Sequence, residues 1–172
     1  MKFLHFCDFH IGGPRGPQAN ALKSLVEMVS SICDQTGETI DAVFLAGDLA
    51  YSGQTSEYDR FRDDFYLPLM QIPGVAKARV FAVPGNHDVD CNVGVPITWE
   101  GIGKKKQDVF FCEDADGQRA RWQRAEVFSP YRQFVKTHGI ESPDPASEVS
   151  KIYESEEFPV TILATNTAFF SD

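Results

Sequence analysis

The chain has 172 residues, of which 42% are hydrophobic and 24% are charged, and its formal net charge is −9. This composition is typical of one globular domain with a substantial core, and it excludes a largely disordered chain. The acidic balance gives no general attraction to nucleic acid or to an anionic membrane. No apolar stretch approaches the ~18 residues needed to cross a bilayer.

The amino terminus and the cysteines favour a cytoplasmic protein. Met1 and Lys2 lead directly into a predicted strand that ends at Asp8, so removal of a signal peptide would destroy a candidate site. The four cysteines, at positions 7, 33, 91 and 112, show no C-x-x-C spacing. We therefore interpret them as reduced thiols, without a disulfide or a zinc site.

Three short apolar runs, at residues 2–7, 42–46 and 79–83, predict β-strands. Between the first two, apolar residues recur at helical spacing over residues 18–35, which predicts a helix. A strand, helix and strand of these lengths form a βαβ unit, in which the strands are parallel. A second helix should begin at a cap on Thr55 or Ser56, and Pro68 should end or kink it.

The second half of the chain is less regular. No periodic pattern is visible from residue 89 to about 117, and a helix is predicted over 118–137, with Pro130 interrupting it. A fourth strand is expected at 160–165. We therefore expect a single α/β domain spanning residues 1–172, with a mostly parallel sheet, flanking helices, and an irregular or helical insert at about 89–137.

Polar residues that suit a metal site follow each of the first three strands. Asp8 and His10 follow the first, Asp48 the second, and Asn86 and His87 the third. Site residues gather at the carboxyl ends of parallel strands. In an extended chain Asp8 and His10 would lie on the same side. Carboxylates, an amide oxygen and imidazoles together suit a pair of divalent cations.

Each of these pieces has an ordinary explanation when it is taken alone. An Asp-x-His is commonly a surface accident, a Gly-Asp is commonly a turn, and an Asn-His-Asp after a strand is commonly a cap. Their joint occurrence, each at a strand end, favours a common site. With Gly47 before Asp48 and Gly85 before Asn86, the three pieces resemble the calcineurin-like metallophosphoesterases, whose pattern is Asp-x-His, Gly-Asp and Gly-Asn-His-Asp or -Glu.

The resemblance implies a four-layer α/β/β/α sandwich and a dinuclear metal centre that hydrolyses a phosphate ester. Asp8 and His10 would bind the first metal, Asp48 would bridge the two metals, and Asn86 would bind the second. Mn²⁺ is the expected metal, with Fe or Zn²⁺ as alternatives.

The resemblance also implies catalytic roles for the two residues after Asn86. His87 would contact the phosphoryl group and protonate the leaving oxygen. Asp88 would orient the imidazole of His87.

The resemblance covers roughly the first half of a typical family domain. The family pattern continues with an isolated His and a Gly-His-x-His, and neither is present here. After His87 only His138 remains, and Gly139 follows it instead of preceding it. We therefore expect that the remaining ligands come from a longer chain or another subunit, or that the site is degenerate.

The substrate is expected to be a phosphate ester, with a nucleotide or a nucleic acid among the candidates. Arg15, the cation of a Gly- and Pro-rich loop, and Asn166, after the last strand, are candidate substrate contacts. The Asn-His-Asp form and the insert favour the phosphodiesterase-like branch of the family. The alternatives are a nuclease component of a larger protein and a non-enzymatic scaffold with an incomplete metal site.

Overall fold

The three strands that precede the candidate ligands form one parallel sheet. The computed structural model describes residues 1–14, 19–90, 92–93, 114–117, 119, 125–145, 148–154 and 160–170. Strands β1 (Phe3–Phe6), β2 (Ala42–Ala46) and β3 (Arg79–Val83) lie in the order β1-β2-β3. Phe6 pairs with Leu45, which pairs with Ala82. All three strands therefore end at the same edge, and the predicted parallel sheet is confirmed.

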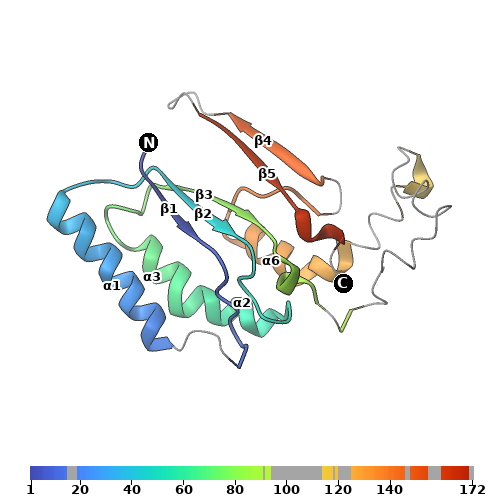
Figure 1. Cartoon of the computed structure of the whole chain (residues 1–172), viewed down its shortest axis with the longest axis horizontal. Coiled ribbons are helices and arrows are strands. Elements are labelled where there is room, and N and C mark those ends of the chain that lie inside the picture. Colours follow the sequence, from blue (N-terminus) through green and yellow to red (C-terminus); the bar gives the residue numbers. More distant parts are fainter. Residues whose placement is uncertain are drawn as a thin grey trace.

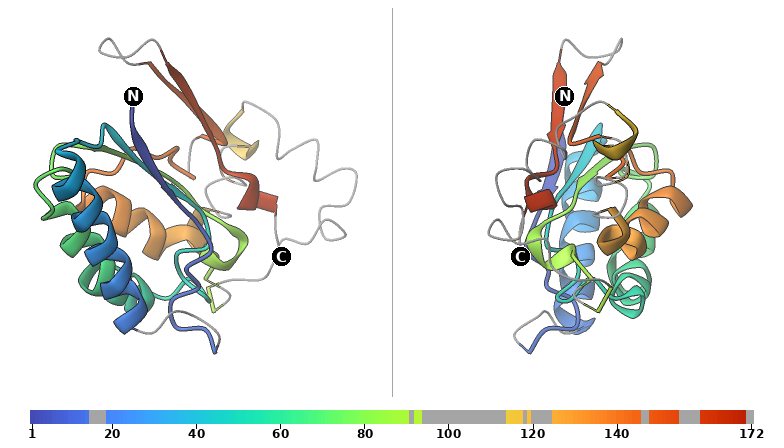
Figure 2. Two further views of the ribbon diagram at one scale, coloured as in Figure 1. Left: turned by 60° about the vertical axis from the view of Figure 1, so that its left-hand side comes forward. Right: turned by 90° about the vertical axis from the view of Figure 1, so that its right-hand side faces the viewer.

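Helices cover one side of this sheet. Helix α1 (Ala19–Thr36) matches the predicted helix to within one residue at each end. A second helical segment runs through α2 (Thr55–Phe61), a π-helical turn (Arg62–Tyr66) and α3 (Leu67–Met70). Figure 2 shows the helices on one side of the parallel sheet and a hairpin on the other. None of the helices among the described residues is long and apolar enough to cross a membrane.

The second helical segment differs from expectation at its start, and near Pro68 it is distorted without ending. Gln54, and not Thr55 or Ser56, is the N-cap, and its backbone N–H donates to the carboxylate of Glu57 at 3.0 Å. The segment continues past Pro68 to Met70. The amide of Leu67 donates to the carbonyl of Arg62, five residues back. This wider turn shifts the hydrogen-bond register just before the proline, which has no N–H to donate.

Pro130 lies in the first turn of a helix, just after a break in helical geometry. A 3₁₀ turn (Glu126–Phe128) leads into α6 (Ser129–Thr137), and Pro130 lies in its first turn. A missing N–H has no cost there, because the first amides of a helix have no partner within it. The predicted apolar face is buried in its described part, which comprises Val127, Phe128, Tyr131, Phe134 and Val135. Much of the expected insert, including residues 94–113, lies outside the described residues.

The fourth predicted strand belongs to a second sheet. Strand β5 (Thr161–Thr165) pairs antiparallel with β4 (Ser150–Glu154), which the sequence analysis did not identify. The ring of Tyr153 meets that of Phe81 on β3 at 5.3 Å, edge to face. The hairpin therefore lies against the parallel sheet, on the side opposite the helices (Figure 1). This arrangement is the expected α/β sandwich.

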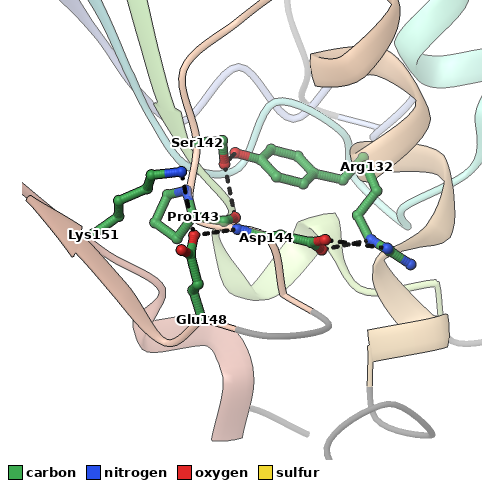
Figure 3. A network of polar contacts seen from close by, with 7 residues as sticks. Arg132, Ser142, Pro143, Asp144, Glu148 and Lys151 are labelled. Carbon is green, nitrogen blue, oxygen red and sulfur yellow. Dashed lines mark hydrogen bonds and ion pairs between the residues drawn. The ribbon is translucent and has the colours of Figure 1, made fainter. Parts of the chain in front are cut away.

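A polar network ties the loop before β4 to α6 (Figure 3). Arg132 Nε donates to Asp144 Oδ1 at 2.9 Å, and the backbone N–H of Asp144 donates to Glu148 Oε2 at 3.3 Å. Lys151 Nζ on β4 lies 3.6 Å from the same Glu148 oxygen. These contacts join helix, loop and hairpin with side chains that are partly exposed, so they fix the path of the loop more than they add stability.

An aromatic cluster fixes the first motif to the core. The ring of Phe9, between Asp8 and His10, lies 5.0 Å from that of Phe61 and 4.7 Å from that of Phe65. Phe61 and Phe65 are completely buried in the second helical segment. Burying Phe9 turns its two polar neighbours outward, at the edge where the strands end.

Candidate metal centre

Asp8, His10 and Asp48 converge at the carboxyl edge of the parallel sheet. One ligand atom from each lies within 4.8 Å of the others. Nε2 of His10 is 3.8 Å from Oδ1 of Asp8. The loops after β1 and β2 therefore bring together two carboxylates and an imidazole, as the sequence predicts.

The backbone that aims these three side chains is strained. Asp8, His10 and Asp48 have φ angles of 59°, 47° and 54°, and no other non-glycine residue in the described part of the chain has a positive φ. This left-handed region costs about 1–3 kcal/mol for each such residue and is concentrated at functional sites. Asp8 and His10 thus reach one point through left-handed backbone, not through the extended chain expected from the sequence.

Hydrogen bonds between the first two loops maintain this conformation. The amide of Asp8 donates to the carbonyl of Gly47 at 3.2 Å, and that of His10 donates to the carbonyl of Asp48 at 2.9 Å. Each loop therefore holds the backbone of the other, and the ligands are oriented by main-chain contacts.

Two glycines allow the second and third loops to approach each other. Gly47 has φ +91°, and a Cβ atom added there would lie 2.9 Å from the Cα of Gly85. A Cβ added to Gly85 would overlap the carboxylate of Asp48. A side chain at either position would push the loops apart, which explains why glycine precedes both Asp48 and Asn86.

Asn86 begins a 3₁₀ turn (Asn86–Asp88) beside Asp48. The backbone N–H of His87 donates to Oδ1 of Asp48 at 2.8 Å. The side chain of Asn86 is exposed. The third loop therefore joins the same site, with one Asp48 oxygen already accepting a hydrogen bond from it.

His87 faces the site and is oriented by Tyr51. Its Nδ1 lies 2.8 Å from the backbone carbonyl oxygen of Tyr51. Because a carbonyl only accepts, this contact places the proton on Nδ1 and leaves Nε2 for another partner. The imidazole rings of His87 and His10 are 4.6 Å apart, edge to face.

The prediction that Asp88 orients His87 is wrong in this geometry. Asp88 is completely buried, and its carboxylate accepts hydrogen bonds from four donors. These are the amides of Leu49, Ala50 and Gly85 and the hydroxyl of Tyr58, at 2.8–3.3 Å. The tight turn directs Asp88 into the core while His87 faces the site. Burial raises the pKa of Asp88, although the hydrogen bonds favour its charged form.

The two candidate substrate contacts have different outcomes. Arg15 lies outside the described residues. Asn166 follows β5 and precedes a 3₁₀ turn (Thr167–Phe170) that contacts the turn carrying His87, but its side chain is completely buried. Both of its amide atoms lack a hydrogen-bond partner among the described residues. The side-chain amide of Asn166 is therefore closed to solvent, and only the turn after it reaches the third loop.

The other two histidines lie elsewhere. His138 packs against the rings of Tyr66 and Phe134, both at 5.1 Å, and burial lowers its pKa. His5 lines a cleft of about 420 Å³ between the two sheets, together with Phe44 and Leu163. Neither histidine belongs to the group formed by Asp8, His10 and Asp48.

The donor set fits a divalent transition metal. Carboxylate oxygens and an imidazole nitrogen suit Mn²⁺, Fe or Zn²⁺ better than Ca²⁺, which prefers oxygen ligands alone. Nδ1 of His10 is buried and has no hydrogen-bond partner among the described residues. The other ring nitrogen, Nε2, lies 3.8 Å from Oδ1 of Asp8, so it is the nitrogen that faces the candidate metal position.

Comparison with known proteins agrees with this geometry. The family model for calcineurin-like phosphoesterases matches residues 1–166. The chain is also similar to YydB of Bacillus subtilis (strain 168), an uncharacterized metallophosphoesterase-like protein, with 22% identity over 176 residues. That match covers 100% of this chain and 34% of YydB, so the chain spans about a third of the length of this relative.

Proposed function

Because the chain belongs to the calcineurin-like phosphoesterase family, we propose that it is a metal-dependent hydrolase that cleaves phosphate esters at a dinuclear centre. The observation that carries this proposal is the convergence of Asp8, His10 and Asp48 within 4.8 Å. Their strained backbone supports it, because the fold maintains a costly conformation at these three positions.

In this proposal Asp8, His10 and Asp48 would hold the first ion, and Asp48 together with Asn86 would hold the second. Mn²⁺ is the metal we propose. Bound divalent ions would supply Lewis acidity and offset the charge that develops on the phosphoryl oxygens. The exposed amide of Asn86 adds an oxygen ligand without adding charge.

His87 is the proposed general acid. Its Nδ1–H is held by the carbonyl of Tyr51, so Nε2 is the atom free to face the leaving oxygen. Donation from Nε2 requires the imidazolium form, because the neutral ring held in this way carries its single proton on Nδ1. Such a proton transfer contributes about 10²- to 10⁴-fold in rate.

We further propose that ligands beyond residues 1–172 complete the second metal site, from a longer chain or from another subunit. Among the described residues, the second ion would have only Asp48 and Asn86. The phosphate ester we propose is a phosphodiester, with Arg15 as a candidate contact. A non-enzymatic scaffold is the alternative, and it would show metal binding without turnover.

Two substitutions test the roles of the acid and the bridging ligand. His87→Asn should leave metal content nearly intact and lower kcat sharply. Asp48→Asn should instead lower the metal content, and activity should be lost because the metal is lost. The loss at His87 should be larger for an alkyl phosphodiester than for a nitrophenyl ester, because nitrophenolate departs without a proton. The measurements are metal analysis and kinetics on both esters.

His138→Asn is the matched control, since it removes a histidine outside the site. It should change neither metal content nor the ratio of the two rates. Loss of metal from His87→Asn, or an equal loss on both esters, would show that His87 is not the general acid.

A further inference from the structure

We propose that Tyr51 is a positioning residue for His87, which it holds by its backbone carbonyl and by its aromatic ring at the same time. This inference rests on the proposed function, in which His87 is the general acid. It assigns to Tyr51 the orienting task that the sequence suggested for Asp88.

The first contact fixes one end of the imidazole. The carbonyl oxygen of Tyr51 lies 2.8 Å from Nδ1 of His87. The amide of the same residue donates to the carbonyl of Ile11 at 3.1 Å, which ties Tyr51 to the loop after His10. The carbonyl is therefore part of a held backbone segment and directs Nε2 away from it.

The second contact fixes the plane of the imidazole. The rings of Tyr51 and His87 are stacked, with centroids 5.2 Å apart and an angle of 22° between their planes. A single hydrogen bond leaves a ring free to rotate about it, whereas a stacked neighbour limits that rotation. The two contacts together determine where Nε2 points.

Gly13 supports the ring of Tyr51. A Cβ atom added at Gly13 would lie 2.6 Å from Cδ2 and 2.8 Å from Cγ of Tyr51. The bare backbone of Gly13 therefore lies directly against the tyrosine ring. Since φ at Gly13 is not in the left-handed region, alanine would fit the backbone conformation there. Its Cβ would press on the ring and would also lie 3.1 Å from the carbonyl oxygen of His10.

The hydroxyl group has no part in this role. It has no hydrogen-bond partner among the described residues, and the side chain is 40% exposed. Phenylalanine would keep both the ring and the carbonyl. Alanine would keep only the carbonyl, so the two substitutions separate ring stacking from the backbone contact.

The test compares Tyr51→Ala, Tyr51→Phe and Gly13→Ala in the full-length, metal-loaded protein. Tyr51→Ala should lower kcat on an alkyl phosphodiester by ~10- to 100-fold, part of the general-acid contribution, and change KM little. Its kcat on a nitrophenyl ester should fall by less than ~3-fold, since that leaving group needs no proton. Gly13→Ala should change the ratio of the two rates in the same direction, and Tyr51→Phe should restore it.

A second measurement does not depend on turnover. In the Zn²⁺-loaded protein, the carbon-bound ring protons of His87 should show an upfield ring-current shift in NMR spectra. The shift should persist in Tyr51→Phe and disappear in Tyr51→Ala. Suppose that Tyr51→Ala loses the ring-current shift but keeps the wild-type ratio of kcat on the alkyl and nitrophenyl esters. Tyr51 would then stack on His87 without positioning the acid, and the inference would be overturned.

Failure of this inference is distinguishable from failure of the proposed function. If His87→Asn shows no leaving-group dependence, His87 is not the acid and the proposed function loses that step. If His87→Asn shows the dependence and Tyr51→Ala does not, only the role of Tyr51 is wrong.

Discussion

Asp88 joins the loops that carry Asp48 and His87. Its buried carboxylate accepts hydrogen bonds from the backbone amides of Leu49 and Gly85, one in each loop. It also accepts a hydrogen bond from the hydroxyl of Tyr58 in α2. Asp88→Asn would turn an amide N–H₂ toward backbone N–H groups. We expect a loss of about 2 kcal/mol in the free energy of unfolding, because buried donors would lose their acceptor. Urea denaturation of the metal-free protein measures it.

The same substitution has a pH dependence whose sign follows from burial. Burial raises the pKa of Asp88, so the folded state binds this proton more tightly than the unfolded state. Its contribution to stability therefore falls as pH rises through that range. The advantage of the wild type over Asp88→Asn should be larger in mild acid than at neutral pH.

Asp63 is the control, since Arg62 lowers the pKa of this exposed carboxyl. Asp63→Asn should give a small trend of opposite sign, reduced by solvent screening. A difference between wild type and Asp88→Asn that does not change with pH would contradict the expectation for Asp88.

At the residue scale, the sequence identifies the proposed ligands better than the groups that would orient them. Asp8, His10 and Asp48 are recognisable by residue type and by their place after strands. Tyr51 orients His87 through a backbone carbonyl, and any residue at position 51 would supply one. The sequence does place an aromatic residue three positions after Asp48, followed directly by the small residues Ser52 and Gly53.

At the scale of elements, the second helical segment supports the first motif. Phe65 is completely buried, and its ring contacts those of Phe6, Phe9 and Phe61. Phe65→Ala should destabilise the protein by ~4 kcal/mol, from lost burial and the cavity left behind. Urea denaturation provides the measurement.

Leu67, in the same segment, is 39% exposed and provides a matched control. Leu67→Ala should cost under ~1 kcal/mol, because a large part of Leu67 already meets solvent and little burial is lost. Similar losses for the two variants would show that Phe65 does not anchor the segment to the core.

Local patterns explain which elements were predictable. The apolar runs of β1, β2 and β3 and the stripe of α1 are properties of contiguous sequence, so they give these elements almost to the residue. The π turn before Pro68 depends on how the helix packs, and β4 contains only two apolar residues, Ile152 and Tyr153. The pairing of β4 with β5 is therefore a tertiary outcome that periodicity does not reveal.

At the scale of the whole molecule, the described residues bring together one well-formed half of the proposed dinuclear site. Asp8, His10 and Asp48 surround one position, whereas a second ion would share Asp48 and gain only Asn86. His5 and His138 lie elsewhere, in the cleft between the sheets and against Tyr66. Divalent ions with few protein ligands bind weakly, so the two metal positions should differ strongly in affinity.

We therefore expect a protein of residues 1–172 to bind close to one Mn²⁺ ion per chain, and weakly, in a calorimetric titration. It should hydrolyse bis-p-nitrophenyl phosphate poorly or not at all, because the charge on the phosphoryl oxygens would be only partly offset. Asp8→Asn should remove the remaining binding, since it takes a carboxylate from the better-formed position. Two tightly bound ions with robust Mn²⁺-dependent turnover would mean that these residues, alone or in a dimer, already complete the centre. A titration repeated at several protein concentrations separates those two cases, because only a shared site requires association.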